Sequence, residues 1–243
     1  MRARKYRKNP KSFDEVRHRF GWTAFHIEPV FSHHLTGMPV SFDSESERQA
    51  RETIKRWAKK YMIWFTKRPY STHIFPLRGA IFHFWFARGV RDAMHSKARL
   101  RTMALDRHGD SGGGIGRKLV NQQAEKLKIV QRPIVLHDVV VGRNTIKQIE
   151  ESTQTPVEVH SLPEPSEFAH VEIPLEKGQS VSMANMVAKK VDARGRLLLG
   201  PLPNSAFRPR QLAMVKRAFY AMGVAATREI QAQTRSRFLF GKQ

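Results

Sequence analysis

Net charge constrains this chain more than any other feature of its sequence. Of 243 residues, 43 are Lys or Arg and 21 are Asp or Glu, which gives a formal charge of +22. Such an excess repels itself within a folded molecule unless a polyanion lies against it. Nucleic acid is the commonest such partner, because every phosphate contact adds affinity that does not depend on base sequence. The composition therefore predicts association with nucleic acid, ahead of a merely basic enzyme.

The charge is distributed unevenly along the chain. Residues 138–188 hold three basic and eight acidic residues, a net charge of −5, whereas the segments before and after them are basic. The last segment, 189–243, holds twelve basic and two acidic residues, a net charge of +10. We therefore expect the acidic segment to face away from phosphate, toward solvent or a protein neighbour.

Several classes of protein are excluded by composition. The chain has no cysteine, so it has no disulfide, no thiolate zinc site and no cysteine nucleophile. Its longest apolar stretch, residues 80–87, is interrupted by His83 and is far shorter than the roughly 20 residues that span a bilayer. The eleven histidines lack the spacing of a zinc site. We expect no metal, no cofactor, no small-molecule substrate and no catalytic residue.

The residue patterns predict an α+β fold with extended basic termini. N-terminal helices are followed by a small central α/β unit, short strands and C-terminal helices. The expected boundaries are a basic extension at 1–43, a helical region at 44–104, a glycine-rich loop with the α/β unit at 105–162, short strands at 163–203, and basic C-terminal helices and tail at 204–243.

The first long helix begins at Ser44, with Glu47 completing a capping box. Its aromatic residues recur at helical spacing and favour a seam against the core, with stacking on RNA bases as the alternative. Its basic residues occupy the other faces and are candidates for phosphate contact. The aromatic residues are Trp57, Tyr61 and Trp64, and the basic ones include Arg48, Arg51, Lys55, Arg56, Lys59 and Lys60.

The pattern of the remaining elements is less regular. A second helix is predicted from Leu77 to about Leu100, with a kink at Gly89, and a third from Pro209 to a C-cap at Gly223. A last helix follows at 225–235. Further helices are predicted at 117–128 and 145–152, and strands at 134–141, 156–160, 168–173, 180–187 and 196–199.

Glycine is concentrated in the loop 106–116, which leads into a basic helix start. A dinucleotide-binding turn would need a buried strand directly before the first glycine, and Leu105 to Ser111 are too polar to supply one. The same loop also holds Asp106, His108 and Asp110, which have no nucleophile beside them. We expect this loop to lie against RNA backbone, because glycine allows close approach.

Residues 141–159 resemble the core of a KH domain, a fold that binds single-stranded RNA. The likeness is carried by Thr145-Ile146-Lys147, Ile149-Glu150-Glu151, Thr153 and Val157-Glu158-Val159. KH domains clamp the RNA backbone with a GXXG loop, of which only Gly142 is present here. The surrounding charge is also negative, so this unit is expected to be structural, and a generic β-α-β unit explains it equally well.

In size, charge and extra helices the whole chain resembles a mitochondrial ribosomal protein. That resemblance implies a structural role in the mitochondrial matrix, with ribosomal RNA and neighbouring ribosomal proteins as partners. An RNA-modifying enzyme or ribosome assembly factor is the first alternative. A basic subunit of a membrane-associated respiratory complex is the second.

The residues expected to contact RNA are basic and lie near chain ends, loops or helix ends. They are Arg2, Arg4, Lys5, Arg7, Lys8, Arg99, Arg101, Arg117, Lys118, Arg208, Arg210, Arg235 and Arg237.

Overall fold

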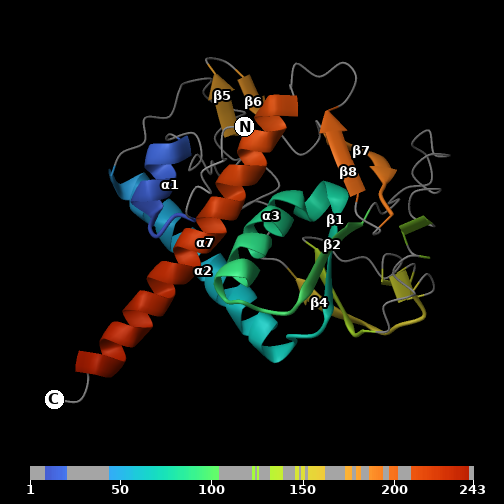
Figure 1. The fold of residues 1–243 in the computed structure, drawn as a ribbon, viewed down its shortest axis with the longest axis horizontal. Coiled ribbons are helices and arrows are strands. Elements are labelled where there is room, and N and C mark those ends of the chain that lie inside the picture. Colours follow the sequence, from blue (N-terminus) through green and yellow to red (C-terminus); the bar gives the residue numbers. More distant parts are fainter. Residues whose placement is uncertain are drawn as a thin grey trace, which may run out of the picture.

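The fold is α+β, as the sequence predicts: helices pack on a four-stranded parallel sheet (Figure 1). The computed structural model describes residues 9–20, 44–103, 122–123, 125, 132–138, 146–147, 149–150, 153–161, 173–176, 179–181, 186–193, 197–201 and 209–240. Within these residues, no helix is both long and apolar enough to cross a membrane.

The main helices are α1 (Phe13–Phe20), α2 (Ser44–Lys67), α3 (Leu77–Ala93) and α7 (Pro209–Phe240). The strands of the sheet are β1 (Thr72–Pro76), β2 (Arg99–Met103), β3 (Ile134–Asp138) and β4 (Val157–Ser161). Two antiparallel pairs follow: β5 (Ile173–Glu176) with β6 (Gln179–Val181), and β7 (Met186–Val191) with β8 (Leu197–Pro201).

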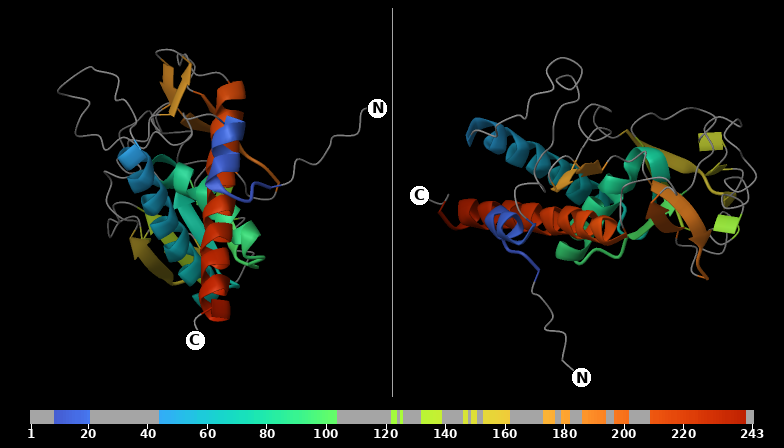
Figure 2. Two further views of the ribbon diagram at one scale, coloured as in Figure 1. Left: turned by 90° about the vertical axis from the view of Figure 1, so that its left-hand side faces the viewer. Right: turned by 90° about the horizontal axis from the view of Figure 1, so that it is seen from above.

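The sheet has the strand order β2-β1-β3-β4, and all its neighbouring strands are parallel. Because side chains alternate along a strand, β1 and β2 each contribute to two cores. Phe75 of β1 belongs to the large core, together with side chains of α2, α3 and α7, whereas Ile74 belongs to a smaller core that includes Ile149. Helices α2 and α3 therefore cover one face of the sheet, and α7 packs on their outer side (Figures 1 and 2).

Helix α2 confirms the sequence prediction of a helix from Ser44, but it is followed by strand β1, which the sequence patterns did not predict. The second predicted helix was wrong at its end, because α3 stops at Ala93 and residues 99–103 form β2. His95 explains the stop. It adopts a left-handed φ of 56°, and the amides of His95 and Ser96 donate to the carbonyls of Asp92 (3.3 Å) and Arg91 (3.0 Å). This is the Schellman arrangement that ends helices.

The predicted roles of Gly89 and Gly223 were also wrong. Gly223 is no C-cap, since α7 runs without a break through Phe240, and the irregular backbone of α3 lies at Ala80 (φ −136°, ψ 17°). The two glycines instead mark the crossing of α3 and α7. A Cβ on Gly89 would overlap the carbonyl oxygen of Tyr220, and a Cβ on Gly223 would overlap that of Phe86. Only glycine lets the two backbones approach this closely.

The central strands confirm the prediction of an α/β unit. Predicted strands at 134–141 and 156–160 correspond to β3 and β4, and that at 196–199 corresponds to β8. The strand predicted at 180–187 is divided between β6 and β7, and that at 168–173 meets β5 only at Ile173. Most of the predicted helix at 117–128 and residues 145, 148, 151 and 152 of the one at 145–152 lie outside the described residues.

Helix α1 attaches part of the N-terminal extension to the core. Phe13 and Val16 are fully buried, and Ser12 caps the helix by accepting a hydrogen bond from the Glu15 amide at 3.3 Å. The Phe13 amide donates to Glu229 Oε1 of α7 at 3.0 Å. Arg228 of α7 donates to the backbone carbonyls of residues 9 and 10. The contacts of the folded core therefore extend back to residue 9.

Candidate nucleic-acid interface

Helix α2 has one apolar and one cationic face. Its apolar residues Ile54, Trp57, Tyr61 and Phe65 are each 1% exposed and form the seam against α3, α7 and the sheet. This confirms the core interpretation of the aromatic stripe at Trp57 and Tyr61. Trp64 is half-buried and packs at 4.8 Å from the ring of His160. The buried rings are therefore shielded from any base that could stack on them.

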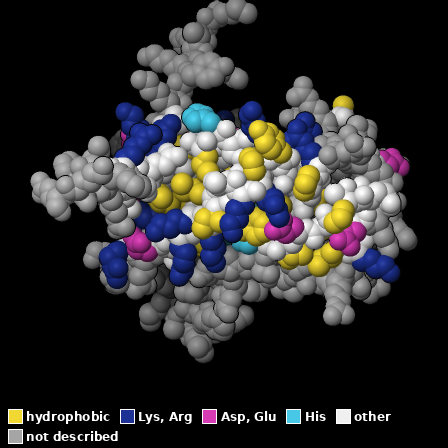
Figure 3. Space-filling view, turned by 90° about the horizontal axis from the view of Figure 1, so that it is seen from below, with side chains coloured by type: hydrophobic (Ala, Val, Ile, Leu, Met, Phe, Trp, Pro, Cys, Tyr) yellow, Lys and Arg dark blue, Asp and Glu magenta, His cyan; other side chains and the backbone are white. Residues whose placement is uncertain are grey.

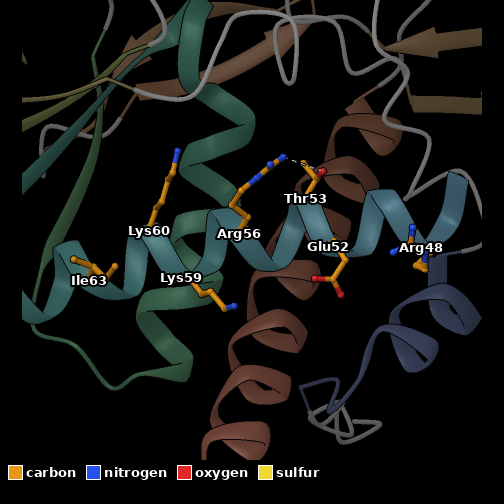
Figure 4. Close-up of a pocket in the computed structure, with 7 residues that line it drawn as sticks. All are labelled: Arg48, Glu52, Thr53, Arg56, Lys59, Lys60 and Ile63. Atoms are coloured by element: carbon orange, nitrogen blue, oxygen red, sulfur yellow. Dashed lines mark hydrogen bonds between the residues drawn. The ribbon is translucent and has the colours of Figure 1, made fainter. Parts of the chain in front are cut away.

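The opposite face of α2 forms an open groove of about 660 Å³. Most of its lining residues are spaced three or four apart, so the set shares one side of the helix along nearly its whole length. Four of them are cationic and one is acidic: Arg48, Arg56, Lys59 and Lys60, with Glu52, Thr53 and Ile63 (Figure 4). We call this surface the α2 groove.

Neighbouring residues reduce the effect of the single acid in the α2 groove. Lys55 Nζ lies 3.4 Å from Glu52 Oε1 and 3.6 Å from Glu229 Oε2, so one cation is shared by two carboxylates beside the groove. Arg56 Nη2 donates to Thr53 Oγ1 at 3.3 Å (Figure 4), which orients the guanidinium along the helix. The α2 groove thus keeps a net positive charge at the surface.

Cationic side chains also occur elsewhere on the described surface. Figure 3 shows Lys and Arg side chains scattered over one face of the molecule, with few acidic side chains among them. In the α2 groove such side chains line a hollow.

Of the predicted RNA contacts, five belong to described residues, and these lie on two separate elements, β2 and α7. Arg99 is exposed and Arg101 half-buried on the edge strand β2, where their separation by two puts them on one face. Arg235 is exposed near the far end of α7, away from β2 (Figure 1), and Arg210 and Arg237 belong to the same helix. The remaining predicted residues lie outside the described part of the chain: Arg2, Arg4, Lys5, Arg7, Lys8, Arg117, Lys118 and Arg208.

Three buried or half-buried histidines form a second cluster, under α2. They come from adjacent strands: His73 on β1, His137 on β3 and His160 on β4. His73 Nδ1 lies 2.7 Å from His137 Nε2, and His137 Nδ1 lies 2.8 Å from His160 Nδ1. We call these three residues the histidine chain. Their nitrogens contact one another in sequence, and no group of three metal-ligating side chains in the described residues could hold an ion.

Burial keeps the histidine chain neutral. It lowers the pKa of His73 to about 4, and lowers that of His137 well below its ordinary value. Burial and then the nearby Lys60 charge lower the pKa of His160 to about 4. Burial also lowers the pKa of His83, which lies on α3. Its Nδ1 is 2.9 Å from the hydroxyl oxygen of Tyr61, and burial raises the pKa of that hydroxyl.

Sequence reasoning missed both the α2 groove as one site and the histidine chain. The signal for the chain was faint: each of three short apolar segments, THIFP, IVLHD and VEVHS, carries a single histidine. Only the strand register shows that the three histidines meet. His137 pairs directly with His160, and His73 pairs with Val135, two residues before His137 on β3.

Comparison of the chain with known protein families, with curated proteins and with solved structures found no match.

Proposed function

We propose that this protein is a structural RNA-binding component of a mitochondrial ribosome. In this role it neutralises phosphates of ribosomal RNA in the mitochondrial matrix and contacts neighbouring ribosomal proteins. The observation that carries the proposal is the α2 groove, a hollow lined by four cations on a chain whose net charge is +22.

The form of the α2 groove suits a polymer backbone better than a small ligand. Small-molecule sites are enclosed concavities that bury most of the ligand surface. This groove is open, follows one helix and is lined by six polar residues and Ile63. Cations spaced along a helix can meet successive phosphates, whose contacts position a protein without reading bases.

Other features support a structural role. The aromatic residues Trp57 and Tyr61 that could stack on bases are buried in the core, so α2 offers phosphate contacts in preference to base contacts. The net negative charge of segment 138–188 suits contact with protein neighbours in preference to RNA, which fits a component placed between RNA and other subunits.

Two lysines of α2 give a matched test. Lys59 lines the α2 groove and Lys67 does not, although both are exposed residues of the same helix. We expect Lys59→Ala to reduce the slope of log affinity against log salt by about 0.7 to 0.9, the share of one phosphate. Lys67→Ala should leave the slope unchanged. The measurement is fluorescence anisotropy with a labelled RNA duplex from about 50 to 200 mM salt.

Cellular association is tested by sedimentation. Tagged protein should migrate with ribosomal particles in a sucrose gradient, and the RNA in its peak should be ribosomal. Treatment with ribonuclease should move the protein to the top of the gradient. A protein that sediments as a free monomer regardless of ribonuclease would contradict the proposal, and one that stays with membranes would favour the respiratory-complex alternative.

A further inference from the structure

The hydrogen bonds of the histidine chain run in one direction. His73 Nε2 lies 3.5 Å from the Arg68 carbonyl oxygen, which can only accept, so this nitrogen carries the proton. His73 Nδ1 then accepts from His137 Nε2, and His137 Nδ1 accepts from His160 Nδ1. With each ring neutral, the chain leaves Nε2 of His160 as its last acceptor.

His160 lies at the border between the histidine chain and the α2 groove. It is half-buried on β4, and its ring packs 4.8 Å from Trp64 of α2. Lys60 precedes Trp64 by one helical turn, so it lies on the same side of α2. The same Lys60 lines the α2 groove (Figure 4). One cation therefore faces both the groove and the accessible end of the chain.

We propose that His160 is a proton sensor for the α2 groove: an RNA phosphate bound beside Lys60 is accompanied by uptake of a proton at His160 Nε2. This inference rests on the proposed function, because it assumes that the groove binds RNA. It adds that binding depends on pH in a range where lysine and arginine do not titrate.

The charges around His160 support this linkage. Lys60 opposes protonation of His160, and a phosphate beside Lys60 offsets that charge, so the pKa of His160 rises from about 4 toward its ordinary value. Coupling between two sites is reciprocal, so protonation of His160 also strengthens phosphate binding.

None of the other groups that face His160 takes up the proton in its place when phosphate binds. They are Tyr61 of α2, His73 of β1 and His137 of β3, with His83 of α3 a further charge acting on His137. All three of these histidines are more deeply buried than His160, which keeps them neutral. On β4 itself, Glu158 forms an ion pair with Arg68 at 2.7 Å.

The test compares the full chain with His160→Asn. Asparagine keeps an amide donor toward His137 Nδ1 but cannot take up a proton. RNA affinity is measured by anisotropy with a labelled duplex at about pH 5.5 and 7.5 and constant ionic strength. We expect the wild-type protein to gain about three- to fivefold more affinity on acidification than the variant does. The comparison removes the contribution of the other histidines.

Lys60→Met supplies an independent variant in case His160→Asn is poorly folded. Without Lys60, the cation that holds a phosphate beside His160 is lost, so the extra pH dependence should disappear. Calorimetry at about pH 6 in buffers of different ionisation enthalpy should detect proton uptake on RNA binding by the wild-type protein only. Equal pH profiles in all three proteins, with normal salt-dependent binding, would overturn this inference alone. Absence of salt-dependent binding in the wild-type protein would overturn the proposed function as well.

Discussion

His73, His137 and His160 occupy positions where a positive charge is unfavourable. Each ring accepts or donates within the chain, and packing by Tyr61 and Trp64 excludes most water from it. Neutral imidazole satisfies this arrangement because it offers one donor and one acceptor. The polar atoms are thus buried at little cost, as long as none of the rings takes a second proton.

This neutrality predicts acid sensitivity of the fold. The folded pKa of His73 is about 4 and its unfolded value is 6.5, so below pH 6.5 the unfolded chain takes a proton that the folded chain refuses. Stability is therefore full above pH 6.5 and falls as the pH drops toward 4, by about 1.4 kcal/mol per pH unit for each such group. Urea denaturation at pH 7.5, 6.5, 5.5 and 5.0 should show the decline.

Two variants distinguish the contribution of the histidine chain to this decline from that of other histidines. His160→Asn removes one titrating ring and should make the decline shallower. His95→Asn should not change it, because His95 is exposed and asparagine tolerates its left-handed φ of 56°. A free energy of unfolding that stays constant between pH 7 and 5 would show that the histidine chain is not held neutral.

At the scale of elements, the crossing of α3 and α7 depends on two glycines. Gly89→Ala places a Cβ against the backbone of Tyr220 and Val224, where nothing flexible can move aside. We expect a loss of about 3 kcal/mol, at the upper end for overpacking, although alanine is the better helix former. Gly223→Ala should behave in the same way, and thermal and urea denaturation measure both.

Ala213→Ser is the matched control for the crossing. It also adds one heavy atom to a small residue of α7, but at an exposed position. Its effect should stay within about 0.5 kcal/mol, as for most surface substitutions. If Gly89→Ala stabilised the protein as helix propensity alone predicts, the close approach of α3 and α7 would be disproved.

Elements with a long, regular pattern could be predicted from sequence, and elements shaped by contacts could not. The stripe of Ile54, Trp57 and Tyr61 specifies α2 by itself, whereas THIFP is a strand because it pairs with β2 and β3 on both sides. Gly223 has the local signature of a helix end, and only the neighbouring backbone of Phe86 explains why the helix continues through it. Local propensity is a weak prior that packing overrides.

The candidate site shows the same division. The cations of α2 are visible in sequence, and their helical spacing already places several on a common face. The histidine chain joins residues 64 and 23 positions apart, which meet only through the parallel register of β1, β3 and β4. No local pattern carries that information, so His160 could not be linked to Lys60 before the sheet order was known.

At the scale of the whole molecule, the N-terminal region holds residues that support the fold and, before them, a strongly basic stretch of sequence. Pro10 and Phe13 are buried, and the Phe13 amide donates to Glu229, so these residues belong to the folded unit. Five basic residues precede them: Arg2, Arg4, Lys5, Arg7 and Lys8. A deletion of residues 1–13 removes the buried Phe13 and its contact with Glu229 and should lower the melting temperature, whereas a deletion of residues 1–8 keeps these contacts.

The shorter deletion then isolates the electrostatic share of RNA binding. If the full chain neutralises six to ten phosphates, its affinity should fall by about 10³ to 10⁵ between 50 and 200 mM salt. The variant without residues 1–8 should show a smaller slope and bind every RNA sequence less tightly by the same factor, because phosphate contacts do not distinguish bases. Anisotropy titrations with three duplexes of unrelated sequence measure both quantities. A flat salt dependence of the full chain, or a loss confined to one duplex, would mean that its surplus of cations does not act on the RNA backbone.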